Sequence, residues 1–131
     1  MRRAKWSVWV VISVLGAALA GCLPGSVVRI DATFDGKTVP VPLNGTLIVD
    51  LESNATTGYA WALDSVDASI LQFEKSEYVA PVTNLVGAGG KELWTFKAIA
   101  AGQTLLKLNY ERSFEPEEDP ADTFEVTVTV E

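Results

Sequence analysis

Apolar and polar residues alternate with a period of two along most of the chain beyond residue 26. The clearest example is the C-terminal run, in which every second residue is apolar: Phe124, Val126, Val128 and Val130. This period is typical of a β-strand with one buried and one solvated face. The same kind of pattern predicts strands over residues 27–34, 46–51, 59–63, 70–79, 92–98, 106–110 and 123–130.

Turn residues separate these runs. The pairs Asp35-Gly36, Asn44-Gly45 and Ala101-Gly102 are typical of turns. Two prolines within residues 37–42 place that segment at the edge of a sheet, because proline cannot donate a hydrogen bond to a β-ladder. Residues 64–69 are a polar connection with room for one short helical turn. About seven short strands and no convincing helix predict an all-β fold, an immunoglobulin-like β-sandwich.

The apolar positions of the predicted strands give the expected core. They are Leu47, Val49, Leu51, Trp61, Leu63, Leu71, Phe73, Trp94, Phe96, Leu106, Leu108, Val126 and Val128. Tyr59 is interpreted chiefly as a further core residue, because large aromatic side chains are buried more often than they are exposed.

The first 26 residues differ from the rest of the chain. A basic start is followed by an uncharged run from residue 6 to residue 21, which ends at Leu19-Ala20-Gly21-Cys22. This ending resembles the lipobox of bacterial secretory signals, in which the cysteine is lipidated and becomes the first residue. The uncharged run is shorter than the roughly 20 residues of a comfortable membrane span, which argues against an uncleaved anchor.

This pattern predicts three parts of the chain. Residues 1–21 are a lipoprotein signal peptide, residues 22–26 are the lipidated Cys22 and a short tether, and residues 27–131 are the folded domain. We expect the protein to be lipid-anchored in a bacterial cell envelope, facing the periplasm or the exterior. Cys22 is the only cysteine, so the domain is held by its core without an intrachain disulfide.

The charge balance limits the partners. The whole chain carries a net charge of −7, and removing the leader leaves 7 basic against 17 acidic residues, a net charge of −10. An acidic surface argues against nucleic acid, and it leaves the lipid as the expected attachment to a membrane. Histidine is absent from the sequence, which removes the commonest general base and metal ligand. These features predict a protein without enzymatic activity, cofactor or metal.

Three connections carry residues that suggest recognition. Asn54 to Gly58 form a polar turn in which Gly58 is expected at positive φ and the hydroxyls of Thr56 and Thr57 are expected to point outward. Residues 81–90 are rich in glycine and contain two adjacent aliphatic residues, Leu85 and Val86. Residues 112–122 form the third connection. In an immunoglobulin-like strand order, all three connections lie at the same end of the sandwich.

These connections resemble one known family in order and spacing over residues 46–130. Asn54-Ala55-Thr56-Thr57-Gly58-Tyr59, followed by Trp61, resembles the Asn-Pro-Thr-Thr-Gly-Tyr motif of the chagasin-like inhibitors of papain-type cysteine peptidases. Gly87-Ala88-Gly89-Gly90 resembles the Gly-x-Gly-Gly segment of that family, and Arg112-Ser113-Phe114 resembles its Arg-Pro-Trp segment. Ala55 and Ser113 replace prolines and Phe114 replaces tryptophan, which makes the loops less preorganised.

The resemblance implies a reversible, tight-binding inhibitor that fills the cleft of the peptidase with three loops. Thr56 and Thr57 would lie over the catalytic cysteine, the second loop would run along the substrate cleft, and the third would bind the opposite wall. The implied peptidase-binding residues are Asn54, Thr56, Thr57, Gly58, Tyr59, Leu85, Val86, Gly87, Gly89, Gly90, Arg112 and Phe114. We expect the inhibitor to be a monomer.

Other interpretations of the same residues stay open at this stage. A structural or adhesive envelope lipoprotein would present the same loops, and the acidic loop from Glu115 to Asp122 would suit a carboxylate enzyme or a calcium module. Asn54 and the two threonines could simply satisfy their own backbone in a tight turn. Arg112 could pair with a neighbouring glutamate on the surface.

Overall fold

The computed structural model describes residues 26–82, 89–112 and 119–131. They form eight strands: β1 (Val27–Asp31), β2 (Thr38–Val41), β3 (Thr46–Ser53), β4 (Tyr59–Ser65), β5 (Leu71–Val79), β6 (Gly90–Ala98), β7 (Gly102–Arg112) and β8 (Asp122–Val130). Two short 3-10 turns, η1 (Ala32–Phe34) and η2 (Ala55–Thr57), are the helical elements of this part of the chain. No helix long and apolar enough to cross a membrane occurs among the described residues.

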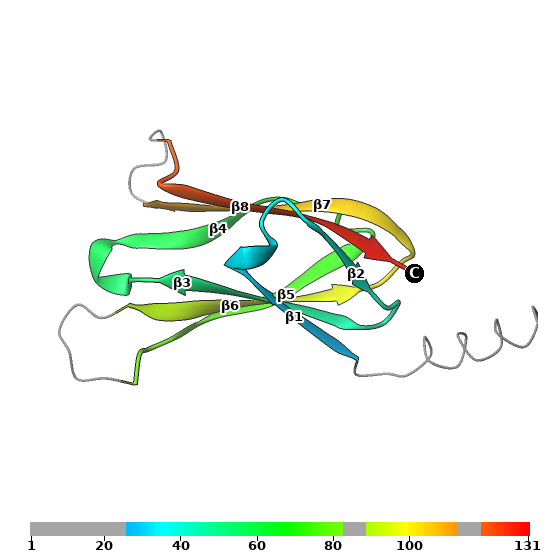
Figure 1. Ribbon diagram of the computed structural model, residues 1–131, viewed down its shortest axis with the longest axis horizontal. Coiled ribbons are helices and arrows are strands. Elements are labelled where there is room, and N and C mark those ends of the chain that lie inside the picture. The colour runs from blue at the N-terminus through cyan, green and yellow to red at the C-terminus, as the bar shows by residue number, and fades with distance from the viewer. Residues whose placement is uncertain (1–25, 83–88, 113–118) are drawn as a thin grey trace, which may run out of the picture.

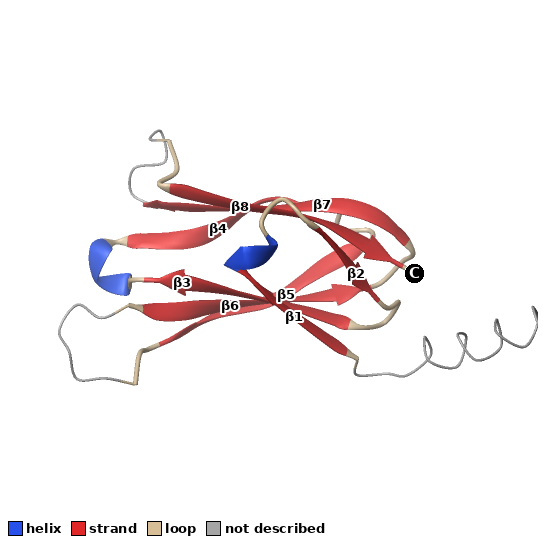
Figure 2. Ribbon diagram, viewed as in Figure 1, coloured by secondary structure: helices blue, strands red, loops and turns tan. Residues whose placement is uncertain are grey.

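The strands form two four-stranded sheets that pack face to face (Figures 1 and 2). The first sheet has the order β1-β3-β6-β5 and the second has the order β2-β8-β7-β4. Neighbouring strands are antiparallel, except that β1 pairs with β3 and β2 pairs with β8 in parallel. The predicted all-β, immunoglobulin-like sandwich is confirmed. Proline-containing β2 lies at a sheet edge, as the sequence predicts.

Two aspartates accept hydrogen bonds from the backbone two residues further on, in the turns that follow β1 and β4. The strand predicted over residues 27–34 stops at Asp31, whose side chain accepts a hydrogen bond from the Thr33 N–H and caps η1. Asp67 forms an equivalent bond with the Ser69 N–H, and its backbone carbonyl oxygen accepts hydrogen bonds from the N–H groups of Ile70 and Leu71, which is the single helical turn that the sequence allowed. Hydrogen bonds from the hydroxyl and N–H of Thr33 lower the pKa of Asp31, and those from Ser69 lower the pKa of Asp67.

The core lies between the two sheets and contains most of the predicted residues. Six buried apolar residues lie outside the predicted core list, although the alternation already placed Phe124 and Val130 on an apolar face: Ile30, Val39, Val41, Ala98, Phe124 and Val130. Leu63 is only partly buried, and the prediction for Phe73 is wrong because its side chain is 40% exposed. β5 is an edge strand with an irregularity between Phe73 and Lys75, so the ring stays partly open to solvent although its centroid lies 5.3 Å from that of Trp94 and 5.8 Å from that of Phe96.

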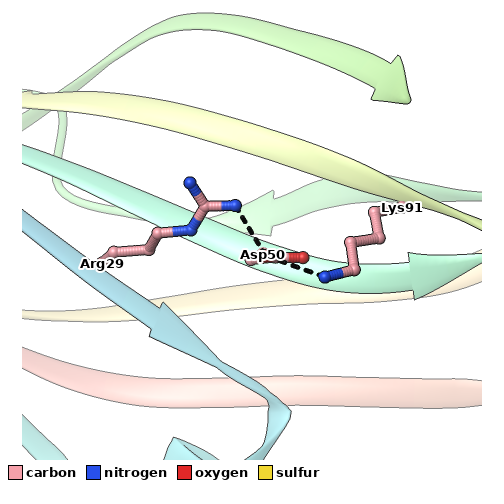
Figure 3. A network of polar contacts seen from close by, with 3 residues as sticks. All are labelled: Arg29, Asp50 and Lys91. Carbon is pink, nitrogen blue, oxygen red and sulfur yellow. Dashed lines mark hydrogen bonds and ion pairs between the residues drawn. The ribbon is translucent and has the colours of Figure 1, made fainter.

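An ion pair network on the outer face of the first sheet connects three strands (Figure 3). Asp50 on β3 lies 2.8 Å from Arg29 on β1 and 3.6 Å from Lys91 on β6. Both cations are more than half exposed, so each pair contributes only about 0–1 kcal/mol. The network supports the strand order without determining it.

Gly90 begins β6 at a place where two strands approach closely. A Cβ atom there would lie 2.2 Å from the Val79 carbonyl oxygen and 2.7 Å from the Tyr78 hydroxyl. At Gly89 the nearest atom to such a Cβ would be the Ser53 carbonyl oxygen at 3.5 Å, an ordinary contact. Gly90 is therefore required for β6 to pair with β5, whereas Gly89 is not.

We predict that Gly90→Ala lowers the free energy of unfolding by about 1–3 kcal/mol, the usual cost of forcing a methyl group into filled space. Gly89→Ala is the matched control and should change it by less than about 0.5 kcal/mol. Urea unfolding followed by tryptophan fluorescence measures both. Equal effects of the two substitutions would contradict the packing described here.

Candidate functional site

The three predicted recognition connections begin and end at one end of the sandwich (Figure 1). They join β3 to β4, β5 to β6 and β7 to β8. Strand pairing brings their ends together, since Ser53 lies opposite Gly90 and Tyr59 lies opposite Arg112. Glu52, Ser53, Asn54, Trp61, Gly89, Gly90, Tyr110 and Asp122 line a hollow of about 440 Å³ between them. The expectation of a shared end is confirmed for the described ends of these connections.

The first loop is a compact turn built around Asn54. The Asn54 side-chain oxygen accepts a hydrogen bond from the Thr56 N–H at 3.1 Å, and the Asn54 backbone carbonyl oxygen accepts one from the Thr57 N–H at 3.2 Å. Gly58 closes the turn at φ 82°, as the sequence predicts. Ala55 to Gly58 are exposed, so the turn projects from the scaffold.

The prediction that both threonine hydroxyls point outward is wrong. The Thr56 hydroxyl donates to the Asn54 side-chain oxygen at 2.6 Å, and the Thr57 hydroxyl donates to the Asn54 carbonyl oxygen at 2.8 Å. Short hydroxyl side chains in a tight turn reach nearby backbone and side-chain acceptors more readily than solvent, which explains the inward direction. The turn therefore satisfies its own polar groups while its residues remain exposed.

Aromatic residues attach the first loop to β7. The Asn54 N–H donates to the Tyr110 hydroxyl at 3.0 Å. The Tyr110 ring stacks on Tyr59 with centroids 5.4 Å apart and lies 5.1 Å from Trp61. Trp61 is buried, as expected, and Tyr59 is partly buried. The loop is therefore held by the strand that leads into the third connection.

Arg112 ends β7 with its guanidinium group 4.5 Å from the centre of the Tyr59 ring. This is the geometry of a cation–π interaction, which is stronger when the pair is shielded from water. Arg112 is partly buried, so the contact links the third connection to the end of the first loop. The Tyr59 ring and partial burial therefore restrict the position of the Arg112 side chain more than an open surface would.

The remaining predicted residues of the second and third connections divide into two groups. Gly89 is exposed, and Gly90 is buried within β6. Leu85, Val86, Gly87 and Phe114 lie outside the described residues, as does Cys22. Residues 115–118 of the acidic loop considered for calcium lie outside them too, whereas residues 119–122 are described. Within the part of the chain that the structure describes, no group of three acidic or cysteine side chains is placed to hold a metal ion.

Glu92 was missed by the sequence interpretation although it lies directly beneath the loops. It is buried, with 9% of its surface exposed, and accepts three hydrogen bonds. The donors are the Ser53 hydroxyl at 2.7 Å, the Trp61 N–H at 3.1 Å and the Trp94 indole N–H at 3.2 Å. The alternation in residues 92–98 contained the signal, because Glu92 is in phase with Trp94 and the other inward residues of β6.

Comparison with known proteins gives the chain a family. A sequence model of the chagasin family of peptidase inhibitors, I42, matches residues 40–128. Chagasin of Trypanosoma cruzi is 29% identical over 103 residues, covering 75% of this chain and 93% of chagasin.

Solved structures with the same fold include the cysteine protease inhibitor EhICP2 of Entamoeba histolytica, with a TM-score of 0.74 and 21% identity over 81% of this chain and 96% of that one. Amebosin has a TM-score of 0.63 and 26% identity, covering 83% of this chain and all of its own. PbICP-C, solved in complex with falcipain-2, has a TM-score of 0.61 and 20% identity over 82% of this chain and all of its own. The structural likeness supports the fold, and the sequence match over residues 40–128 shows that this chain belongs to the chagasin family of peptidase inhibitors.

Proposed function

We propose that this protein is a reversible, tight-binding inhibitor of papain-type cysteine peptidases that fills the active-site cleft with three loops. The observation that carries the proposal is the convergence of the ends of all three motif-bearing connections at one end of a rigid sandwich. PbICP-C, which shares the fold, was solved in complex with falcipain-2. Membership of an inhibitor family favours this function over that of an adhesive envelope protein.

The first loop is suited to enter the cleft. Thr56 and Thr57 are exposed on a turn whose shape is fixed by its own hydrogen bonds, and Gly58 lets the backbone approach the catalytic cysteine closely. A loop that is already shaped loses little entropy on docking. Inhibition requires no reaction: the loops would occupy the cleft without placing a carbonyl carbon in attack geometry, about 3–3.5 Å from the thiolate.

The other two connections would bind the walls of the cleft. Leu85, Val86, Gly87 and Gly89 would line the substrate side, where glycine leaves backbone groups accessible for hydrogen bonds. Gly90, which the sequence also assigned to this surface, is buried in β6 and would act only by letting β6 pair with β5. Arg112 and Phe114 would bind the opposite wall through charge-assisted bonds and apolar burial. The contact of Arg112 with Tyr59 supports this role, because it orients the guanidinium group before docking.

Titration of residues 23–131 against papain and a cathepsin L-like enzyme tests the proposal. Thr57→Arg should raise Ki at least about 100-fold, since a bulky charge at the tip of the first loop cannot enter the cleft without steric and desolvation cost. Gln103→Arg makes a similar change at the exposed opposite end and should leave Ki unchanged. Failure of the unmodified domain to inhibit either enzyme at micromolar concentration would reject the proposed function.

Ala55 is positioned to accept the proline that the family motif carries. It opens a 3-10 turn, where φ is close to the value fixed by proline, and Asn54 before it is extended at φ −117° and ψ 102°. Ala55→Pro should raise the free energy of unfolding by about 0.4–1 kcal/mol and lower Ki by a few-fold, because the unbound loop samples fewer conformations. Thermal unfolding and the same titration measure the two effects. A higher Ki with intact folding would show that the loop must change shape to bind.

The N-terminal pattern supports a lipid anchor in a bacterial envelope, with the domain facing the periplasm or the exterior. Cys22 would carry the lipid, and residues 23–26 would form the tether to β1. Cys22→Ser should move the protein from the detergent phase to the aqueous phase when cells that express the full chain are fractionated. Retention of the variant in the membrane would indicate an uncleaved leader.

A further inference from the structure

We propose that Glu92 is a positioning residue for inhibition, which fixes the first loop relative to the other two. This inference rests on the proposed function and extends it to a residue that is buried beneath the binding surface. Glu92 does not reach the exposed tip of the loop, so any effect on affinity must act through the residues that it holds.

Glu92 connects the two ends of the first loop, which lie in different sheets. The loop passes from β3 in one sheet to β4 in the other, and these two strands share no β-ladder. Ser53 immediately before the loop and Trp61 shortly after it both donate hydrogen bonds to the same Glu92 oxygen, Oε2. One atom therefore fixes the separation of the two ends of the loop across the gap between the sheets.

Glu92 is itself held rigidly. It lies on β6, opposite Leu51 on β3 and Tyr78 on β5. Its second oxygen, Oε1, accepts the indole N–H of Trp94. A buried carboxylate is stable only when it is well hydrogen-bonded, and three donors in fixed positions leave this side chain little freedom.

The same residue relates the loops to one another. β6 begins at Gly90, where the second connection ends, two residues before Glu92. The first loop is also bound to the Tyr110 hydroxyl on β7, just before the third connection. Glu92 and Tyr110 thus hold the first loop at a set position between its two neighbours, which is the condition for one rigid wedge.

A purely stabilising role predicts a different outcome from a positioning role. Glu92→Leu leaves the buried donors of Ser53, Trp61 and Trp94 without this acceptor, so it should also lower the urea midpoint. A purely stabilising role then predicts that Ki rises no more than in a core variant of similar stability. In a positioning role, the ends of the first loop would also lose their shared acceptor, and the cost of ordering them would be paid on docking. We therefore expect affinity and stability to separate in Glu92 variants.

The test compares Glu92→Gln, Glu92→Leu and Val128→Ala in residues 23–131, a range that contains the whole sandwich. Val128 is fully buried in the core on β8, opposite Thr104 near the start of β7 and away from the loop end. Ki for papain, the midpoint of urea unfolding and amide hydrogen exchange at Thr57 are measured for each protein. The Thr57 N–H donates to the Asn54 backbone carbonyl oxygen within the loop, so its exchange reports the order of the loop itself.

Glu92→Leu should raise Ki by about tenfold, the effect of one or two side chains that must be newly ordered on binding, and should accelerate exchange at Thr57. Glu92→Gln should have a smaller effect, because its carbonyl oxygen can replace Oε2. Val128→Ala should lower the urea midpoint and leave Ki and exchange at Thr57 unchanged.

Ki values that follow the urea midpoint across all three variants would overturn the proposal, as would unchanged Ki and exchange in folded Glu92→Leu. If Glu92→Leu does not fold, the changes in Ki and in exchange at Thr57 in Glu92→Gln decide whether the proposal holds. If the unmodified domain inhibits neither papain nor the cathepsin L-like enzyme, the proposed function fails, and exchange at Thr57 alone decides whether Glu92 positions the loop.

Discussion

The two sheets are joined by side-chain packing, and this constraint governs the rest of the molecule. The described strands form two separate ladders, so no backbone pairing links one sheet to the other. Over most of the interface, apolar side chains such as Phe96, Leu108 and Phe124 fill the space and set the distance between the sheets. For a loop that starts in one sheet and ends in the other, the relative position of its two ends depends on how tightly this packing fixes the two sheets.

The character of the packing changes where precision matters for binding. Near the loop end, the apolar interior gives way to directional contacts among Ser53, Trp61, Glu92 and Tyr110. Apolar contacts tolerate small sliding movements, whereas hydrogen bonds lose strength rapidly with distance and angle. A polar cluster at this end fixes the loop geometry more sharply than further leucines or valines would, at a cost in desolvation that the cluster itself offsets.

Much of the scaffold could be predicted from alternation alone, because a strand with one buried face repeats every two residues. The run from Phe124 to Val130 reads unambiguously, and its burial follows the pattern. The predictions fail for residues whose burial or hydrogen bonding depends on neighbours that only the folded chain brings close. Phe73 has the right phase but lies on an irregular edge strand, and Glu92 has an inward phase that its charge made implausible. The hydroxyls of Thr56 and Thr57 were placed wrongly because only the folded turn brings the acceptors on Asn54 within reach.

The edge strand β5 also affects whether copies of the protein associate at high local concentration. Eight of its nine residues are exposed, and a straight, apolar edge of that length would invite pairing with a second molecule. The irregularity after Phe73 interrupts the row of free backbone groups, and Lys75 and Glu77 add charge beside it. Copies concentrated on one surface would therefore resist joining edge to edge into a larger sheet, and each would keep its loop end available to a separate target.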